Sequence, residues 1–449
     1  MQKAMPKTLL SAEQLAGNFA DLHPAYNRNQ AVVEAARCLF CFDAPCMRAC
    51  PTHIDVARFI RQILHDNPAG AAKTIFTENI FGGSCARACP TEVLCEGACV
   101  DRMLGGPVQI GRLQRYATDF AMQRGLRFFE PGSPSARKVA IVGSGPAGLS
   151  CAHELRKQGH TVTVFEARDV PGGLNTLGIA AYKITTEFAL SEVEPIKEMG
   201  VEIRLNSPVN AAKLAELHSS YDAVFLGIGL GATGGLGIPG ETTSGVWEAL
   251  DFIFPTHTGP LSDCPVGRNV VVIGAGNTAI DVATQAVRLG AESVLIAYRR
   301  TQKEMSAFAY EYELAKADGV RFEWCVQPLE FLSHNENLAG IKFHRLDQQT
   351  DQSRAAALKP IVNSEFVIPC DMAVKALGQT ALLDQLAGIE GLRFEKGKLL
   401  VDPETGATGV PGLFAGGDCI SMGAEIVNAV QEGKVAARGI DQYLKTLVG

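Results

Sequence analysis

Two dense groups of cysteines near the start of the sequence constrain the fold more than any other feature. The groups are Cys38-x2-Cys41-x4-Cys46-x3-Cys50-Pro51 and Cys85-x3-Cys89-Pro90 followed by Cys95-x3-Cys99. They place eight of the 13 cysteines within the first hundred residues of a 449-residue chain. Sets of four close thiols bind either zinc or iron–sulfur clusters, and spacing alone does not always separate the two. Helical patterns such as "DVARFIRQILHDNPAGAAKTI" lie between the cysteine loops, so the sequence predicts a helical metal-binding domain.

Composition narrows the class of protein. A length of 449 residues with 47% apolar residues suggests about three globular domains. The net charge of −7 offers no excess positive charge for nucleic acid or an anionic membrane surface. The start of the sequence lacks the apolar core of a signal peptide, and no run reaches the roughly 18 apolar residues of a spanning helix. We therefore expect a cytoplasmic protein, in which clustered cysteines indicate metal or redox chemistry rather than disulfides.

A glycine fingerprint follows the strand "VAIV". It consists of Gly143, Gly145 and Gly148, with a helix expected from about Pro146. Such glycines permit a tight turn and the close approach of a pyrophosphate, which then sits at the N-terminus of the helix. Glu166 ends the next strand, where a carboxylate can accept hydrogen bonds from a ribose diol. Because the flanking strands and the acid are both in place, the pattern predicts a dinucleotide site rather than a merely glycine-rich turn.

A second fingerprint follows the strand "NVVVI". Its residues are Gly274, Gly276, Asn277 and Thr278. The next strand ends in Arg299 and Arg300, and no acid stands at the ribose position. This favours NADP(H), because an arginine can clamp the 2′-phosphate with paired hydrogen bonds. NAD(H) is the second choice, and an exposed basic strand end without a nucleotide role is the simpler alternative.

Two dinucleotide modules in one chain predict a flavoprotein, and two further stretches complete the flavin site. They are "PGGLNTLGI", which contains Gly173 and Leu174, and "GLFAGGDCISMGAEIVNAVQEGKVAA", which contains Gly417 and Asp418. The second stretch resembles the segment that completes FAD sites in pyridine-nucleotide flavoproteins. No cysteine pair follows Gly173, so electrons must leave the flavin by a route other than a redox disulfide. A flavin can release its two electrons singly, so the eight thiols favour two [4Fe–4S] clusters over structural zinc.

The fold class expected is therefore α/β, with a helical N-terminal iron–sulfur domain and two Rossmann-like dinucleotide-binding domains, the second inserted in the first. The expected boundaries are 1–136 for the iron–sulfur domain, 137–259 and 381–449 for the two parts of the FAD domain, and 260–380 for the NADP(H) domain.

Over essentially its whole length the chain resembles the small subunit of glutamate synthase and the N-terminal half of dihydropyrimidine dehydrogenase. The stretches "APCMRACPTHIDVARFI" and "CARACPTEVLCEGAC" are similar to the second of these, and specifically to the flavin-containing, PreT-type subunits of the bacterial enzyme. The resemblance implies the ligands of each cluster. One cluster would take Cys38, Cys41, Cys46 and Cys99; the other would take Cys50, Cys89, Cys95 and, unusually, a glutamine that aligns with Gln114. Cys85 is left over, either as a packed thiol or in place of Gln114.

The family also implies the function. The chain would take hydride from NAD(P)H onto FAD and pass electrons through two [4Fe–4S] clusters to a partner. That partner would be an FMN- and iron–sulfur-containing catalytic subunit, which reduces uracil or thymine to the 5,6-dihydropyrimidine in a TIM barrel of about 250 residues. Neither step in this chain needs a side-chain acid or base, so we assign no catalytic residue. The alternatives are a glutamate synthase small subunit, a related ferredoxin:NADP oxidoreductase, and a zinc-stabilised flavin-binding redox sensor that is not an enzyme.

Overall fold

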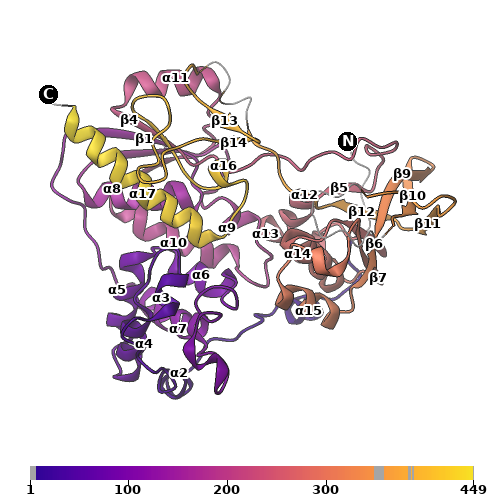
Figure 1. Ribbon diagram of the computed structural model, residues 1–449, viewed down its shortest axis with the longest axis horizontal. Helices are drawn as coiled ribbons and strands as arrows, with labels where there is room; N and C mark the ends of the chain where they lie inside the picture. The colour runs from indigo at the N-terminus through magenta and orange to yellow at the C-terminus, as the bar shows by residue number, and fades with distance from the viewer. Residues whose placement is uncertain (1–6, 348–357, 383–385, 387–388, 448–449) are drawn as a thin grey trace. The chain divides into compact units, whose positions relative to one another are not determined.

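The computed structural model describes residues 7–347, 358–382, 386 and 389–447, and the chain divides into two compact units. We call residues 21–176, 183–231 and 381–449 the cysteine unit, and residues 1–20, 177–182 and 232–380 the inserted unit. Figure 1 shows both units, and it draws the helices between residues 28 and 123 of the cysteine unit in indigo to purple. The first twenty residues belong to the inserted unit, where Leu15 is buried in its core.

The N-terminal part of the cysteine unit is helical, as predicted, and we call it the helical region. Its helices are α2 (Arg28–Ala35), α3 (Pro45–Ala49), α4 (Val56–Leu64), α5 (Pro68–Glu78), α6 (Gly82–Ala88), η1 (Val100–Met103) and α7 (Ile110–Gln123). Helix α4 shows why these segments fold: Asp55 caps its N-terminus by accepting from the Arg58 N–H, and apolar residues recur at the spacing of one helical face. That face, which includes Phe59 and Ile60, is fully buried.

The rest of this unit, which we call the sheet region, is a parallel sheet of order β15-β4-β1-β2-β3 with its helices. Its strands are β1 (Lys138–Val142), β2 (Thr161–Phe165), β3 (Glu202–Arg204), β4 (Ala223–Leu226) and β15 (Leu413–Ala415), with β13 (Phe394–Glu395) and β14 (Lys398–Leu399) as a separate hairpin. Its helices are α8 (Pro146–Lys157), α9 (Leu174–Leu177, which ends in the inserted unit), α10 (Thr186–Glu198), α11 (Ala211–Ser220), α16 (Asp418–Ser421) and α17 (Ile426–Thr446). The central strands are buried apolar runs, as expected where helices cover both faces of a parallel sheet.

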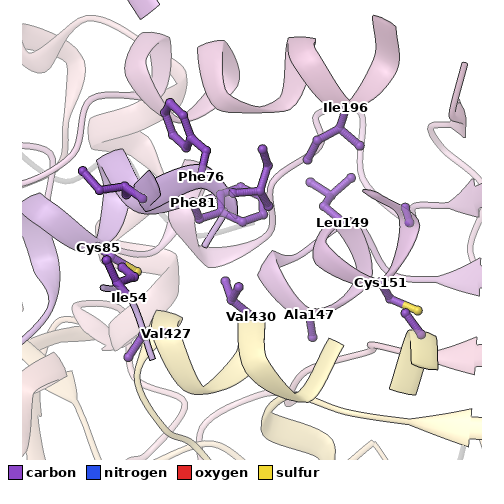
Figure 2. Packing of buried hydrophobic residues seen from close by; sticks show 14 of the residues in the cluster. Ile54, Phe76, Phe81, Cys85, Ala147, Leu149, Cys151, Ile196, Val427 and Val430 are labelled. Carbon is purple, nitrogen blue, oxygen red and sulfur yellow. The ribbon is translucent and has the colours of Figure 1, made fainter. Parts of the chain in front are cut away.

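One hydrophobic core joins the helical region to the sheet region of the cysteine unit. Figure 2 shows Phe76 and Phe81 from the helical region near Leu149 of α8 and Val430 of α17. Helix α17 packs closely on α8, because a Cβ at Gly433 would come within 2.3 Å of the Ala147 carbonyl oxygen. The two parts therefore share buried apolar surface, which holds the cysteine loops against the sheet region.

The inserted unit has a second parallel sheet, of order β5-β12-β6-β7-β8, and an antiparallel sheet of order β11-β10-β9. The strands are β5 (Val246–Glu248), β6 (Asn269–Ile273), β7 (Ser293–Tyr298), β8 (Arg321–Trp324), β9 (Val326–His334), β10 (Asn337–Arg345), β11 (Phe366–Pro369) and β12 (Met372–Lys375). The helices are α1 (Ala12–Asn18), α12 (Ala249–Ile253), α13 (Pro255–Thr258), η2 (Leu261–Asp263), α14 (Asn277–Arg288), η3 (Gln302–Glu304) and α15 (Ala309–Ala317). The predicted α/β class is confirmed. Across the described residues, no helix is both long and apolar enough to cross a membrane.

Candidate functional site

Four of the clustered cysteines line one cavity in the helical region. Cys38, Cys41, Cys46 and Cys99 all face it, and apolar side chains that include Val56, Ile60 and Val108 form most of the remaining wall. Burial raises the pKa of the Cys46 thiol to about 11, and the neighbouring thiols of Cys38 and Cys99 add to this effect. The cysteines that the family resemblance grouped as one ligand set are thus brought together around one apolar space.

The other cysteines of the two groups form a second set. The Cys85 thiol and burial raise the pKa of the Cys89 thiol well above its ordinary value, and Cys95 and Cys50 add smaller effects. Within the described part of the chain, no three His, Cys, Asp or Glu side chains are placed to hold a single metal ion. A [4Fe–4S] cubane binds each of its ligands to a different iron atom, so its four ligands surround the cluster instead of sharing one metal.

Gln114 and Cys85, the two candidates for the eighth ligand, are both buried. The Gln114 side chain donates from Nε2 to the Gly82 carbonyl oxygen at 2.7 Å, which leaves its amide oxygen as the atom that could bind iron. The Cys85 sulfur accepts a hydrogen bond from the side-chain nitrogen of Asn79 at 3.1 Å, and it also lies within hydrogen-bonding reach of the Cys89 thiol. The structure thus shows a glutamine whose amide is oriented by the backbone, and a Cys85 thiol that contacts both Asn79 and a cysteine of the second set.

Glu192 of α10 ties the helical region to the sheet region. Its carboxylate accepts hydrogen bonds from the backbone N–H groups of Gly83 and Ser84 and from the Ser84 hydroxyl, at the start of α6. Burial raises the pKa of Glu192 to about 7, although these donors and the nearby Arg87 guanidinium act in the opposite direction. Because Cys89 is the C-cap of α6, this contact holds the helix that presents a candidate cluster ligand.

The first glycine fingerprint forms the turn between β1 and α8. Gly143 has a φ of +98°, and a Cβ there would come within 2.3 Å of the Gly227 carbonyl oxygen, so only glycine fits. Gly145 is the N-cap of α8 and has no other atom within 4 Å of its Cβ position, which leaves room for a phosphate at the helix N-terminus. A Cβ at Gly148 would come within 2.0 Å of the Gly143 carbonyl oxygen, so Gly148 keeps the helix close to the turn.

Glu166 follows β2 and is nearly buried beneath this turn. One carboxylate oxygen accepts from the Ser144 N–H at 2.9 Å and from the Ser144 hydroxyl at 2.5 Å, and the other accepts from the Arg168 N–H. A carboxylate has about four acceptor directions, so Glu166 can shape the turn and still accept from a ribose. The sequence indicated the ribose role but not the bond to Ser144.

The remaining predicted flavin residues lie at the same end of the sheet. Gly173 packs against the fingerprint, because its Cβ position is 2.8 Å from the Gly145 Cα, and Leu174 begins α9. Gly417, with a φ of +80°, precedes α16 and donates its N–H to Glu432 of α17 at 2.6 Å. Asp418 accepts from the Ala424 N–H at 3.1 Å, and burial raises its pKa. Segments from three parts of the sequence thus meet where ligands bind in open α/β sheets, beyond the carboxyl ends of the strands.

The second fingerprint forms the equivalent turn between β6 and α14. Gly274 has a φ of +127°, and a Cβ there would come within 2.2 Å of the Ala376 carbonyl oxygen. Gly276 is the N-cap of α14, and Thr278 in its first turn is exposed. Asn277 accepts from the Phe308 N–H at 3.0 Å, so its side chain orders a neighbouring loop.

The two arginines after β7 differ in their surroundings. Arg300 is mostly buried and pairs with Glu304 at 2.9 Å, in a turn where Glu304 also accepts from the Thr301 hydroxyl at 3.0 Å. Arg299 is exposed, and no ion pair involving it is found among the described residues. The exposed Arg299 can reach a ligand without breaking an existing ion pair.

Sequence reasoning missed several residues that shape these sites, namely Asn79, Ser84, Ser144, Glu192 and Glu432. Ser144 lies inside the first fingerprint and Glu432 inside the C-terminal stretch quoted above, so their positions in these motifs were a signal that they belong to the site. Glu192 offered no such signal, because it lies 108 residues from Ser84 in the sequence.

Two family models match the chain. Residues 15–126 match the model described as dihydropyrimidine dehydrogenase domain II, 4Fe-4S cluster, and residues 137–433 match pyridine nucleotide-disulphide oxidoreductase. The solved structures with a similar fold include Mycobacterium tuberculosis FprA in complex with NADPH, with a TM-score of 0.57 and 19% identity over 69% of this chain and 85% of that chain. The thioredoxin reductase of T. acidophilum is also similar, with a TM-score of 0.52 and 21% identity over 70% of this chain and 100% of that chain.

Curated relatives match across both regions. The chain is 35% identical over 430 residues to the PreT subunit of NAD-dependent dihydropyrimidine dehydrogenase from Escherichia coli K12, covering 95% of this chain and 98% of that protein. It is 33% identical to the small chain of E. coli glutamate synthase [NADPH], covering 98% and 96%. It is 36% identical to the beta subunit of the NADP(+)-dependent formate dehydrogenase of Moorella thermoacetica, covering 90% of this chain but only 60% of that longer protein.

These matches separate the alternatives that the cysteine spacing left open. The cofactors are [4Fe–4S] clusters, FAD and a pyridine nucleotide, which excludes a zinc-stabilised scaffold. The protein is an NAD(P)H-dependent oxidoreductase that works as an electron-transfer subunit. The predicted resemblance is confirmed: the chain belongs to the pyridine nucleotide-disulphide oxidoreductase family, among the flavin and iron–sulfur subunits that include PreT and the glutamate synthase small chain.

Proposed function

We propose that this chain is the electron-input subunit of a dihydropyrimidine dehydrogenase. It would oxidise NADPH and deliver electrons to a separate subunit that carries FMN and iron–sulfur clusters and reduces uracil or thymine. The observation that carries this proposal is the match to PreT over 95% of this chain and 98% of that protein, with eight clustered cysteines placed in two sets.

The proposed ligand sets follow the family resemblance. Four thiols that face the apolar cavity, Cys38, Cys41, Cys46 and Cys99, would hold one cluster. The second cluster would be held by Cys50, Cys89, Cys95 and Gln114, with Cys85 retained as a buried, hydrogen-bonded thiol. The cavity suits a cluster because its apolar wall keeps water away from the iron and sulfide atoms.

The proposed flavin site uses the first fingerprint, and the proposed NADP(H) site uses the second. Gly145 leaves space for the pyrophosphate, Glu166 lies within reach of the ribose, and the Gly417–Asp418 loop closes the site from the C-terminal segment. Bound FAD would supply the chemistry, accepting a hydride and releasing electrons one at a time. In the inserted unit, Arg299 would hold the 2′-phosphate and so favour NADPH over NADH. The proposed domain limits are 1–136, 137–259 with 381–449, and 260–380, although the compact units group the first twenty residues with the inserted unit.

Reconstitution with a catalytic subunit tests this function. The purified chain should oxidise NADPH with an artificial acceptor but form no dihydrouracil. Adding the FMN-containing subunit of a bacterial dihydropyrimidine dehydrogenase should produce dihydrouracil. Cys46→Ser should abolish this coupled activity while direct flavin reduction by NADPH persists. Uracil reduction by the pure chain, or no coupling to the added subunit, would contradict the proposal.

Supply of electrons to a glutamate synthase large chain is the second candidate. It is favoured by the match to the glutamate synthase small chain over 98% of this chain and 96% of that protein. Glutamine-dependent glutamate formation with the large chain, without dihydrouracil formation in the parallel assay, would make it the function.

A further inference from the structure

We propose that the surface over the first cysteine set is the docking face for the electron acceptor, and that the acceptor presents an apolar centre with an acidic rim. We define the docking face as five exposed apolar residues and three exposed basic ones. They are Leu39, Phe42, Val100, Met103 and Leu104, with Arg58, Arg61 and His65. The proposal deepens the proposed function, because it describes where and how the partner binds.

The apolar residues are too concentrated to be ordinary surface. Among the described residues, 14 large apolar side chains are exposed, and five of them lie in the short segments that directly follow Cys38 and Cys99. Phe42 is fully exposed, and Met103 and Leu104 are 82% and 81% exposed. Exposed apolar residues grouped in this way mark interaction sites, because a solvated surface gains nothing from them.

These residues also form the outer wall of the cavity. Leu39 and Val100 line it together with all four cysteines of the first set, yet their side chains are 55% and 48% exposed. One layer of side chains therefore separates this cavity from solvent at this face. Electron transfer weakens steeply with distance, so a partner seated here would bring its own redox centre as near as the fold permits.

The two apolar segments are fixed to each other by Arg37. Its guanidinium donates to the carbonyl oxygens of Gly105 and Gly106 at 3.2 and 2.5 Å and pairs with Asp101 at 3.1 Å. A pre-formed face of this kind loses little conformational entropy when a partner binds.

Positive charge borders the same face. Arg58 and Arg61 are exposed three residues apart on α4, and both line a hollow that also contains Phe42, Cys41 and the Asp55 carboxylate, with His65 at the C-cap of the helix. Within the described residues, neither arginine has an ion-pair partner within 4.0 Å. Arg61 lies over the Phe40 ring at 4.8 Å, which leaves its charge available at the surface. A basic row on a protein of net charge −7 favours a partner with acidic groups at its rim.

Two cytochromes of opposite charge test the docking face without knowledge of the natural partner. Cytochrome b5 surrounds its haem edge with carboxylates, and cytochrome c surrounds its haem edge with lysines. At low salt, Arg58→Glu combined with Arg61→Glu should lower kcat/KM for cytochrome b5 by about tenfold and raise it for cytochrome c. Both effects should shrink at high salt, because screening weakens interactions between exposed charges.

Control variants separate docking from damage. Arg268→Glu combined with Arg321→Glu makes the same charge change on exposed residues of the inserted unit and should leave the preference between cytochromes unchanged. Iron, sulfide and NADPH oxidation with menadione, a neutral acceptor, should match wild type in both double variants. Equal changes for the two cytochromes, or the same change in the control pair, would overturn the proposal.

The apolar part is tested by Phe42→Ser, with Val362→Ser as the matched change at another exposed apolar residue. Phe42→Ser should raise the KM for the reconstituted catalytic subunit at least several-fold with unchanged cluster content. If Phe42→Ser instead converts a dimer to a monomer on gel filtration and leaves the KM unchanged, the face binds a second copy and the proposal is wrong. The cytochrome result stands even if pyrimidine reduction fails, so the two proposals fail separately.

Discussion

Glu192 of α10 accepts hydrogen bonds from both the backbone N–H and the hydroxyl of Ser84, across 108 residues of sequence. This single buried carboxylate joins the sheet region to α6, whose C-cap is Cys89. The contact connects the region proposed to bind flavin with the region that supplies the cysteines, and the two regions share one hydrophobic core.

This contact predicts a pH-dependent stability. The pKa of Glu192 is about 7 in the folded protein and about 4.5 when unfolded, so the unfolded chain loses its proton first as pH rises. The free energy of unfolding should therefore fall between about pH 4.5 and 7, by an amount on the order of 3 kcal/mol from this group. Glu192→Gln cannot ionise and should flatten the dependence of Tm on pH across that range.

The matched control is Glu194→Gln, an exposed position on the same helix. Anaerobic thermal melts of the three proteins at several pH values supply the comparison. If the wild-type and Glu192→Gln melting temperatures change in parallel with pH, burial does not raise this pKa.

The second cluster should depend on Gln114 and not on Cys85. Gln114→Leu removes the amide oxygen proposed to bind iron, so iron and acid-labile sulfide should fall from about eight to about four of each per chain. Cys85→Ser should keep both clusters, because the family resemblance leaves Cys85 outside both ligand sets and its sulfur already accepts from Asn79. Cys325→Ser, in the inserted unit, controls for loss of a buried cysteine. If Cys85→Ser loses a cluster and Gln114→Leu keeps its full iron and sulfide content, Cys85 is the eighth ligand and Gln114 is not.

Nucleotide preference should depend on the exposed arginine. Removing one charge-assisted contact to the 2′-phosphate should cost roughly 1.5 to 3 kcal/mol, or about 10- to 150-fold in preference for NADPH. Arg299→Ala should show this loss with little change in NADH turnover. Arg300→Ala should lower the preference for NADPH less, because Arg300 already pairs with Glu304. The ratio of kcat/KM for NADPH and NADH measures the effect, with Arg268→Ala as the control. An unchanged ratio in both variants would show that neither arginine holds the 2′-phosphate.

FAD retention should depend on Glu166. Glu166→Ala leaves the Ser144 N–H and hydroxyl without their acceptor and removes the proposed ribose contact. The FAD retained after gel filtration should fall, while Glu202→Ala, an exposed change on the adjoining β3, should retain it. Full FAD occupancy in Glu166→Ala would show that the fingerprint turn holds the dinucleotide without this acid.

The sequence predicted the elements whose chemistry is local. Gly143 and Gly274 need positive φ in turns that follow buried strands, and the cysteine spacing depends on short loops, so both patterns are visible in a few consecutive residues. The packing of Glu192 on Ser84 could not be predicted, because it arises only when distant helices meet in the folded core. The sequence also could not show that, among the described residues, Arg300 is paired and Arg299 is not, because the geometry of the turn decides which arginine lies beside Glu304.

One chain is proposed to carry both a flavin and two clusters as an electron-transfer unit. Anaerobic reductive titration with light and deazaflavin, followed by absorbance and electron paramagnetic resonance, counts the electrons that these cofactors accept. We expect uptake of about four electrons per chain, two by FAD and one by each [4Fe–4S] cluster, with two cluster signals in the reduced protein. Uptake of only two electrons, with stoichiometric zinc and no acid-labile sulfide, would contradict it.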